Sequence, residues 1–443
     1  MVAAKRIEPH PAFAELFGGV KGSLPGAGVM ASTREGSFER FSALGFPTTR
    51  VEAWKYTNVA RATNQPMALA PRVDVGLNDV SAHLAGGPQA RRLIFVNGHL
   101  LPQLSHVKGL PAGVVVADLA QMIERDPARV AAALAPADDD VGFEALNAAF
   151  TRSGAWIEVP DGVAVEAPVQ LLFLTVGQES AVMSHPRCVV RLGKGARLRL
   201  IETHAALRPG HCLTNEVMRI ELDADAVLEH DRLMVLDDAM THIGRLDTVL
   251  QDRARLDQTV AILGGGLVRN EIDARLEGSH IECLLNGVYM TAGREHVDTA
   301  IRIRHLAPDS HSDQAYKGIV DGSSRAAFAG KILVAQAAQR TNAFQSNNNL
   351  LLTDDAQIDS KPELEIYADD VKCSHGATCG DLDARQLFYL RSRGLPRDKA
   401  ESILTYAFAA ELFERFKDET LRKQAQRAAL ARLPGGAALK EML

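Results

Sequence analysis

The chain has 443 residues, enough for two or three domains of about 150 residues each or for one elongated architecture. Hydrophobic residues make up 46% and charged residues 23%, which is the balance of an ordinary soluble protein. A formal net charge of −6 argues against a general attraction to nucleic acid or to membranes. Aromatic residues are sparse at 5%, so stacking surfaces for single-stranded nucleic acid are not expected.

The compartment is indicated by what the sequence lacks. Residues 1–20 contain no continuous apolar segment of the kind that a secretory signal needs. The longest apolar runs, such as residues 169–176, are far shorter than the roughly 20 residues of a membrane span. Five cysteines are scattered without the spacing of a disulfide framework. We therefore expect a soluble, cytoplasmic protein that does not enter a membrane.

Residues 1–150 are predicted to form an N-terminal region of short helices, loops and a few strands. Apolar residues recur with helical spacing around residues 13–17 and 38–44. Residues 93–96 are typical of a strand, and residues 117–150 are rich in alanine and predicted to be helical.

Residues 151–380 have a different pattern, in which short β-type segments are separated by turn signals. Examples of these signals are Gly193-Lys194-Gly195, Asp223-Ala224-Asp225 and Gly264-Gly265-Gly266. Neighbouring signals lie about 13 to 17 residues apart, with no convincing long amphipathic helix between them. A β-sandwich or barrel accepts this pattern. A stacked parallel β-helix also accepts it and fits the even spacing better. The pattern by itself leaves both folds open.

Residues 381–443 are predicted to form a C-terminal helical domain. One helix is expected over residues 381–391 and a second over residues 396–417. The second helix carries apolar residues over a wide arc, so it must be covered on two sides, by its own domain or by a partner. The main stripe of that arc consists of Leu404, Phe408, Leu412 and Phe416.

The strongest candidates for chemistry are Cys373 and His375. On an extended strand, residues i and i+2 point to the same side, so a thiolate and an imidazole would lie together there. This pair of ligand types suits iron or zinc. Cys379 could add a third ligand if a turn at Gly376 folded the chain back, and the acidic pair at residues 369–370 could supply oxygen atoms. The alternative is that the cysteine is a small buried hydrophobic residue.

Other candidates are weaker. Residues 305–311 contain histidine, aspartate and serine side chains but no Gly-x-Ser-x-Gly nucleophile elbow. Gly264-Gly265-Gly266 lacks the Lys-Ser/Thr of a phosphate-binding loop, so a tight turn is expected there and no nucleotide should bind to this chain. The helix over residues 396–417 is apolar where a DNA-recognition helix needs polar side chains, so nucleic-acid binding is not expected.

Several longer segments resemble those of a known protein family, which the spacing of turns and apolar residues alone does not reveal. They are residues 52–57 (EAWKYT), 345–352 (QSNNNLLL), 358–362 (IDSKP), 364–366 (LEI), 369–378 (DDVKCSHGAT) and 386–394 (QLFYLRSRG). Together they resemble the SufB/SufD family of iron–sulfur cluster assembly proteins, most densely over residues 310–417.

Within the family, the sequence is similar to the SufD branch. Residues 373–376 read Cys-Ser-His-Gly, which is typical of that branch. The SufB branch has a cysteine important for cluster building immediately after the glutamine that aligns with Gln345, and this sequence has Ser346 there. Cys379 departs from the family pattern, which has an aliphatic residue at this position.

The resemblance implies a mainly β fold, with a right-handed parallel β-helix between N-terminal and C-terminal helical regions. It also implies a non-catalytic scaffold that pairs with SufB through the β-helix and docks the SufC ATPase through its C-terminal helices. In that case Cys373 and His375 are candidate ligands for iron or a nascent iron–sulfur cluster, held transiently with SufB. The docking candidates for SufC are Leu404, Phe408, Leu412 and Phe416. A homodimer is plausible when SufB is absent.

A mechanism consistent with these expectations is that ATP-driven closure of a SufC dimer pulls on the C-terminal domains. That movement would shift the β-helix interface and expose Cys373 and His375.

Overall fold

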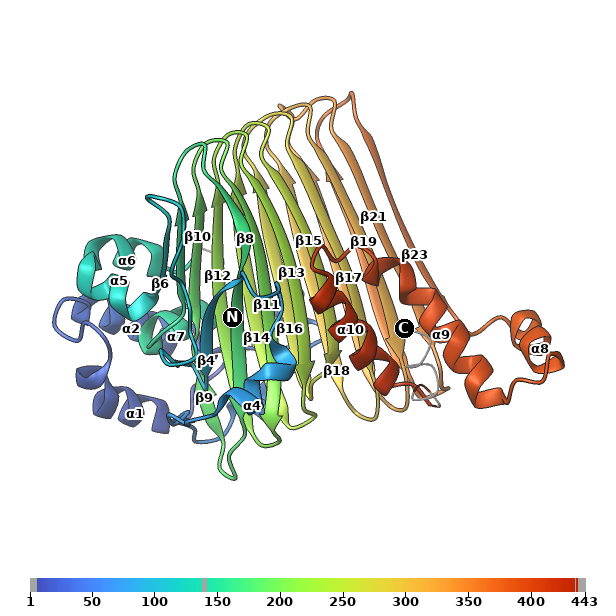
Figure 1. Ribbon diagram of the computed structural model, residues 1–443, viewed down its shortest axis with the longest axis horizontal. Coiled ribbons are helices and arrows are strands. Elements are labelled where there is room, and N and C mark those ends of the chain that lie inside the picture. Colours follow the sequence, from blue (N-terminus) through green and yellow to red (C-terminus); the bar gives the residue numbers. More distant parts are fainter. Residues whose placement is uncertain (1–5, 138–141, 435, 437–443) are drawn as a thin grey trace.

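The computed structural model describes residues 6–137, 142–434 and 436. Its centre is a β-solenoid of about eight turns, built from two long sheets that face each other (Figure 1). The parallel β-helix expected from the family resemblance is therefore confirmed, and a sandwich or barrel is excluded. A small antiparallel pair, β1 (Arg6–Ile7) and β2 (Phe46–Pro47), lies outside the two sheets.

The two sheets contain alternate strands of the chain, because each turn of the solenoid contributes one strand to each sheet. The first sheet consists of β6 (Val115–Asp118), β7 (Ala155–Val159), β10 (Arg187–Leu192), β12 (Cys212–Leu222), β14 (Met240–Leu250), β16 (Leu267–Leu276), β18 (His296–His305), β20 (Arg325–Val334) and β22 (Gln357–Ile366), with β9 (Val182–Ser184) paired to β12 and β3 (Ala68–Leu69) paired to β9. The second consists of β5 (His99–Leu100), β4 (Arg91–Val96), β8 (Ala164–Val176), β11 (Arg197–Arg208), β13 (Val227–Leu236), β15 (Arg255–Gly264), β17 (Glu282–Thr291), β19 (His311–Val320), β21 (Asn342–Leu351) and β23 (Lys372–Gly380).

Parallel, in-register pairing stacks equivalent residues of successive turns. Leu228 of β13 pairs with Leu256 of β15, which pairs with Cys283 of β17. Since side chains alternate along a strand, every second residue points into the space between the sheets. Inward apolar residues from both sheets therefore form one continuous core that runs along the solenoid.

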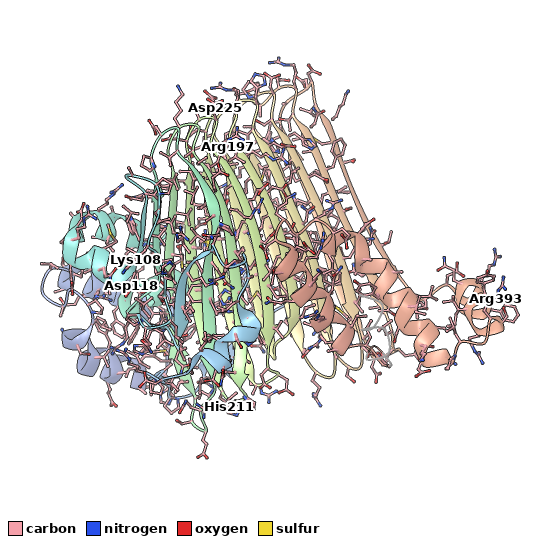
Figure 2. All side chains as sticks on the ribbon, in the orientation of Figure 1. Lys108, Asp118, Arg197, His211, Asp225 and Arg393 are labelled. Atoms are coloured by element: carbon pink, nitrogen blue, oxygen red, sulfur yellow. The ribbon has the colours of Figure 1, made fainter. Side chains whose placement is uncertain are left out.

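The turn signals in the sequence correspond to the corners of the solenoid. At one corner a residue with a left-handed backbone recurs about every 30 residues, at Gly195, Asp225, Arg253, Asp309 and Arg340 among others. Each full turn passes two edges, so the spacing of 13 to 17 residues in the sequence is half a turn. Asp225 lies at one edge of the solenoid and His211 at the opposite edge (Figure 2).

The N-terminal region contains α1 (Ala12–Val20), η1 (Lys21–Ser23), α2 (Ala31–Leu44), η2 (Glu52–Trp54), α3 (Ala60–Thr63), α4 (Leu77–Val80), η3 (Ser81–His83), α5 (Leu119–Arg125), α6 (Pro127–Leu134) and α7 (Phe143–Phe150). Helices α1, α2, α5, α6 and α7 cover one end of the solenoid, whereas α4 lies in front of the strands (Figure 1). Buried aromatic residues hold α1, α2 and α7 together, as in the edge-to-face contact of Phe17 with Phe150. The predicted region 1–150 is not separate from the solenoid, because β4 pairs with β8 and β6 with β7.

The motif at residues 52–57 fastens the N-terminal region to the outer face of the first sheet. The buried Arg269 guanidinium lies 4.6 Å from the centroid of the Trp54 ring and forms an ion pair with Asp298. The Thr57 hydroxyl donates to the same carboxylate. This buried set explains why a tryptophan and a threonine stand at these positions.

The C-terminal helices are α8 (Ala384–Ser392), α9 (Arg397–Phe413) and α10 (Glu419–Ala431). The two predicted helices at 381–391 and 396–417 correspond to α8 and α9. Helices α9 and α10 contact the outer face of the second sheet at β13 to β19, whereas α8, which precedes Arg393, projects beyond the last strands (Figures 1 and 2). None of the helices in the described ranges is long and apolar enough to cross a bilayer.

Candidate metal and cluster-ligand site

Strands β22 and β23 form the last turn of the solenoid. Strand β22 pairs with β20 and β23 pairs with β21, and no strand among the described residues covers their other sides. An uncovered edge offers unpaired backbone N–H and C=O groups to another chain. The end opposite the N-terminal helices is therefore open.

Cys373 and His375 lie on this last strand and on the same face of it, as the sequence predicted. Cys373 pairs with Ala343 and His375 with Gln345, and both partners are buried. Cys373 is half-buried beside an apolar cluster that includes Ala343 and Ala368, whereas His375 is exposed. Burial raises the pKa of the Cys373 thiol, so without a bound cation this group is protonated at neutral pH.

Cys379 does not join the pair, because Gly376, where a turn would have been needed to fold it back, lies within a regular strand. Strand β23 runs without interruption from Lys372 to Gly380 and pairs with β21 along its length. His375 and Cys379 are four positions apart on the strand, a distance of about 13 Å. The acidic pair at residues 369–370 lies exposed in the turn before the strand. The candidate ligands on this strand are thus one thiol and one imidazole.

Large apolar side chains are exposed near the same end. Phe344, Ile366 and Tyr367 are 40%, 39% and 58% exposed. Helix α8 presents Phe388 and Tyr389, which are 75% and 57% exposed. Exposed aromatic residues gathered at an open edge are typical of a surface that another protein covers.

The four candidates for docking the ATPase have two different environments. Leu412 and Phe416 are 1% and 3% exposed, because α9 and the segment after it lie flat on the second sheet. In this conformation they stabilise the chain itself and are not accessible to a partner. Leu404 and Phe408 are half-buried, and the Lys317 ammonium lies 5.0 Å from the centroid of the Phe408 ring.

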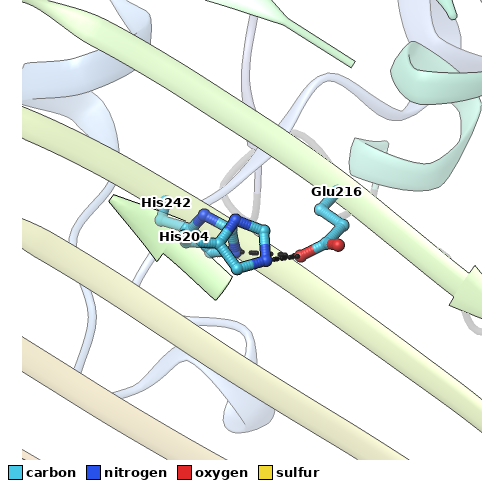
Figure 3. Close-up of side chains that lie close together, drawn as sticks. All are labelled: His204, Glu216 and His242. Carbon is cyan, nitrogen blue, oxygen red and sulfur yellow. Dashed lines mark ion pairs between the residues drawn. The ribbon is translucent and has the colours of Figure 1, made fainter. Parts of the chain in front are cut away.

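A second cluster lies inside the solenoid and was missed by the sequence analysis. His204 of β11, Glu216 of β12 and His242 of β14 point toward one another in the interior (Figure 3), and their side chains are only 2–3% exposed. Arg232 of β13 lies among them, with its Nη2 atom 2.5 Å from Glu216 Oε2. Glu202 accepts from His230 at 2.9 Å and lies 2.9 Å from Arg232 Nε.

The electrostatics of this interior cluster follow from burial and from the single guanidinium. Burial lowers the pKa of His242 to about 3 and also lowers that of His204, so both imidazoles are neutral. Burial opposes ionisation of Glu202, but the Arg232 charge and two histidine hydrogen bonds hold its pKa well below the ordinary value. Burial and the neighbouring Glu202 charge raise the pKa of Glu216 to about 7.

Only the register of the strands reveals this cluster. The sequence shows only that polar residues stand at every second position in two short segments, at Glu202 and His204 and at His230 and Arg232. Such a pattern indicates a strand with one polar side and nothing more. The parallel pairing of β11 with β13 brings Glu202 opposite Arg232. The neighbouring inward positions, Leu200 and Leu228, belong to the apolar core, so the polar residues are inside as well.

Comparisons with known proteins agree with this architecture. The model of the SufBD core domain of the SUF system for FeS cluster assembly matches residues 173–408, and that of the SufBD N-terminal region matches residues 13–171. The iron–sulfur cluster assembly protein SufD of Escherichia coli K12 is 35% identical, over 89% of this chain and 90% of its own length. An iron–sulfur cluster assembly SufBD family protein of Synechocystis is 31% identical, over 87% of each chain. Protein ABCI7, chloroplastic, of Arabidopsis thaliana is 27% identical over 89% of this chain and 84% of its own length.

The chain therefore belongs to the SufB/SufD family and has a role in iron–sulfur cluster assembly. Within this family it is of the SufD type, as Cys373 to Gly376 and Ser346 predicted.

Proposed function

We propose that this chain is a non-catalytic scaffold subunit of the SUF assembly complex in the cytoplasm. It pairs with SufB through the open end of its β-helix, docks the SufC ATPase through its C-terminal region, and contributes ligands to iron or a nascent cluster at the SufB interface. The observation that carries the proposal is the uncovered last turn, which presents Cys373 and His375 on one face.

Pairing with SufB uses the edges of β22 and β23. A second β-helix with a matching open end would satisfy the free backbone groups and cover Phe344, Ile366 and Tyr367. Without SufB, the same edge would pair with a second copy of this chain, which gives a homodimer.

The ligand role of Cys373 and His375 requires a partner. One thiolate and one imidazole provide two positions, whereas iron–sulfur and zinc sites in proteins usually take four ligands. SufB supplies the remaining positions, so the cluster or iron is bound only while the two subunits are paired. Because the Cys373 thiol is protonated before binding, the metal must displace that proton.

An enzymatic role for Cys373 is the second candidate function. A cysteine nucleophile is normally activated by a lowered pKa, and here burial raises it. That direction favours a ligand over a nucleophile. A persulfide or mixed disulfide trapped on Cys373 during turnover would instead support sulfur transfer.

SufC docks on the accessible part of the C-terminal region. This surface comprises Phe388 and Tyr389 of α8 and the half-buried Leu404 and Phe408. ATP-driven closure of SufC would then move α8 and α9 and shift the interface at β23. His375 is exposed in the single chain, so its concealment in the resting complex depends on SufB. If alkylation of Cys373 in the complex proceeds at the same rate with and without ATP, this coupling is wrong.

The test of the main proposal is the iron and acid-labile sulfide content of the SufB–SufC–SufD complex isolated from cells. Wild type is compared with Cys373→Ala and His375→Ala, after assembly has been verified by gel filtration. Cys379→Ala is the matched control, since it removes a thiol from the same face of the same strand. Loss of iron and sulfide in the first two variants alone supports the ligand role. Unchanged content in all variants would assign the chemistry to SufB.

A further inference from the structure

The three ligand atoms inside the solenoid have the spacing of a metal site. His204 Nε2 lies 3.4 Å from Glu216 Oε2, and His242 Nε2 lies 3.3 Å from the same oxygen (Figure 3). In a tetrahedral site with bonds of 2.0–2.1 Å, ligand atoms are about 3.4 Å apart. His204 Nε2 also lies 2.5 Å from Glu202 Oε1, so it must leave this partner and present its lone pair before the three groups can hold one ion in common.

The chemistry of the three groups selects the kind of ion. Two neutral imidazoles and one carboxylate are the set that ferrous iron and zinc take in proteins, whereas magnesium and calcium prefer oxygen ligands. Glu216 has one buried oxygen, Oε1, without a hydrogen-bond partner, so its carboxylate is incompletely satisfied.

The position between these atoms holds the cation of Arg232. Its Nη2 atom lies 2.5 Å from Glu216 Oε2, 3.4 Å from His204 Nε2 and 3.3 Å from His242 Nε2. The rest of the guanidinium is held elsewhere, since Nε lies 2.9 Å from Glu202 and Nη1 donates to Asn270 at 3.2 Å. Because the guanidinium is planar and rigid, a metal at this position requires the whole head group of Arg232 to turn, and its contacts with Glu202 and Asn270 must rearrange.

Space at the cluster depends on a glycine. A Cβ atom at Gly244 would lie 2.9 Å from His242 Nε2 and 3.4 Å from Arg232 Nη2. Two carboxylates, Glu202 and Glu216, share the single guanidinium of Arg232.

We propose that His204, Glu216 and His242 form a buried site for a divalent transition-metal ion, ferrous iron or zinc, for which the metal and Arg232 Nη2 compete. The four strands that carry these residues are paired on both sides, so the ion enters during folding or when neighbouring turns separate, and it exchanges slowly. This site is independent of Cys373 and His375, which lie on β23.

The experiment refolds the full chain from denaturant and chelator in the presence of Zn²⁺ or Co²⁺ alone. Cys373→Ala and His375→Ala are included in every sample so that the edge site does not contribute. Bound metal is measured by mass spectrometry after desalting, and the Co²⁺ absorption spectrum reports the ligand geometry. Circular dichroism verifies the fold of each variant.

Near-stoichiometric metal is expected in this background, and His242→Gln should weaken binding by about 100-fold or more. Arg232→Gln should strengthen it, because the competing cation is gone. His230→Gln is the matched control, since this interior histidine contacts Glu202 and not the three ligands. The affinity of the His230→Gln variant for the metal should be unchanged.

The proposal is overturned if neither the starting chain nor Arg232→Gln retains metal, or if His242→Gln binds as tightly as His230→Gln. If only Arg232→Gln retains metal, the metal and Arg232 Nη2 do compete for one position, and in the natural chain the guanidinium occupies it. If Arg232→Gln fails to refold, the comparison of His242→Gln with His230→Gln decides.

Discussion

Glycines in the strands leave room for large rings inside the solenoid. In the pairing of β17 with β19, Gly287 stands beside Tyr316 and Gly318 beside Tyr289. A Cβ atom at Gly287 would lie 2.1 Å from a carbon of the Tyr316 ring. The ring is fully buried, so it has no free space into which to move.

We therefore expect Gly287→Ala to lower the free energy of unfolding by about 1–3 kcal/mol through overpacking. Urea denaturation followed by circular dichroism measures the change. Gly380→Ala is the control, because a Cβ there meets nothing within 4 Å. Equal stability of the two variants would mean that the interior tolerates a shift of the tyrosine.

Asp231 joins the solenoid to the start of α10. Its carboxylate accepts the backbone N–H groups of Lys417 at 2.8 Å and Asp418 at 2.7 Å, and burial raises its pKa to about 7. The unfolded value is about 3.9, so the folded chain holds a proton that the unfolded chain releases. The contribution of this proton to stability is complete below about pH 4 and is lost as the pH rises through about 7.

The stability of wild type relative to Asp231→Asn should accordingly fall between about pH 4 and pH 7. The variant lacks the titrating group but keeps every other carboxylate. Subtracting its free energy of unfolding therefore removes the pH dependence that the other carboxylates cause. Urea denaturation at a series of pH values gives the difference in free energy. A difference that grows with pH would mean that the two N–H donors stabilise the ionised carboxylate more than burial destabilises it.

At the scale of elements, the C-terminal helices separate residues that hold the fold from residues available to a partner. Phe416→Ala should lower the free energy of unfolding by about 3–5 kcal/mol, since its ring is buried against the second sheet. Replacing Phe388 and Tyr389 together by alanine should leave stability within about 0.5 kcal/mol, because both are exposed. The same double variant should weaken binding to SufC, measured by calorimetry. Unchanged SufC affinity would remove α8 from the docking surface.

The elements could be predicted from the sequence better than their contacts. The helical spacing of apolar residues predicted α8 and α9, and the strand predicted at Leu93–Val96 covers most of β4. The apolar arc of α9 was visible, but which part faces the sheet depends on the docking of the helix, so the burial of Leu412 and Phe416 was not predicted. A third ligand from Cys379 depended on a turn at Gly376, and Gly376, often a turn residue, lies here in a regular strand.

At the scale of the whole molecule, the even spacing of turns left a sandwich and a solenoid open, and the family resemblance decided between them. Local spacing does not specify which strands pair, because parallel pairing joins residues about 30 positions apart. The interior cluster around Arg232 was invisible for the same reason. Only the stacked register brings residues from β11, β12, β13 and β14 to one place.

The solenoid is closed at one end by the N-terminal helices and open at the other, so association should be controlled by the last strand. Ala377 is exposed on the face of β23 that carries Cys373 and His375. A lysine there places a flexible charge at the open end, a device that blocks edge-to-edge pairing. Ala377→Lys should abolish pairing with SufB, and the homodimer as well, without lowering the melting temperature of the isolated chain.

Ala14→Lys is the control for added charge, since Ala14 is exposed on α1 at the closed end. Analytical ultracentrifugation of each variant, alone and mixed with SufB, measures the association. If Ala377→Lys assembles as wild type does while Ala14→Lys does not, SufB binds the N-terminal end. In that case Cys373 and His375 would lie at a free end of the complex, and their ligand role would need a partner other than SufB.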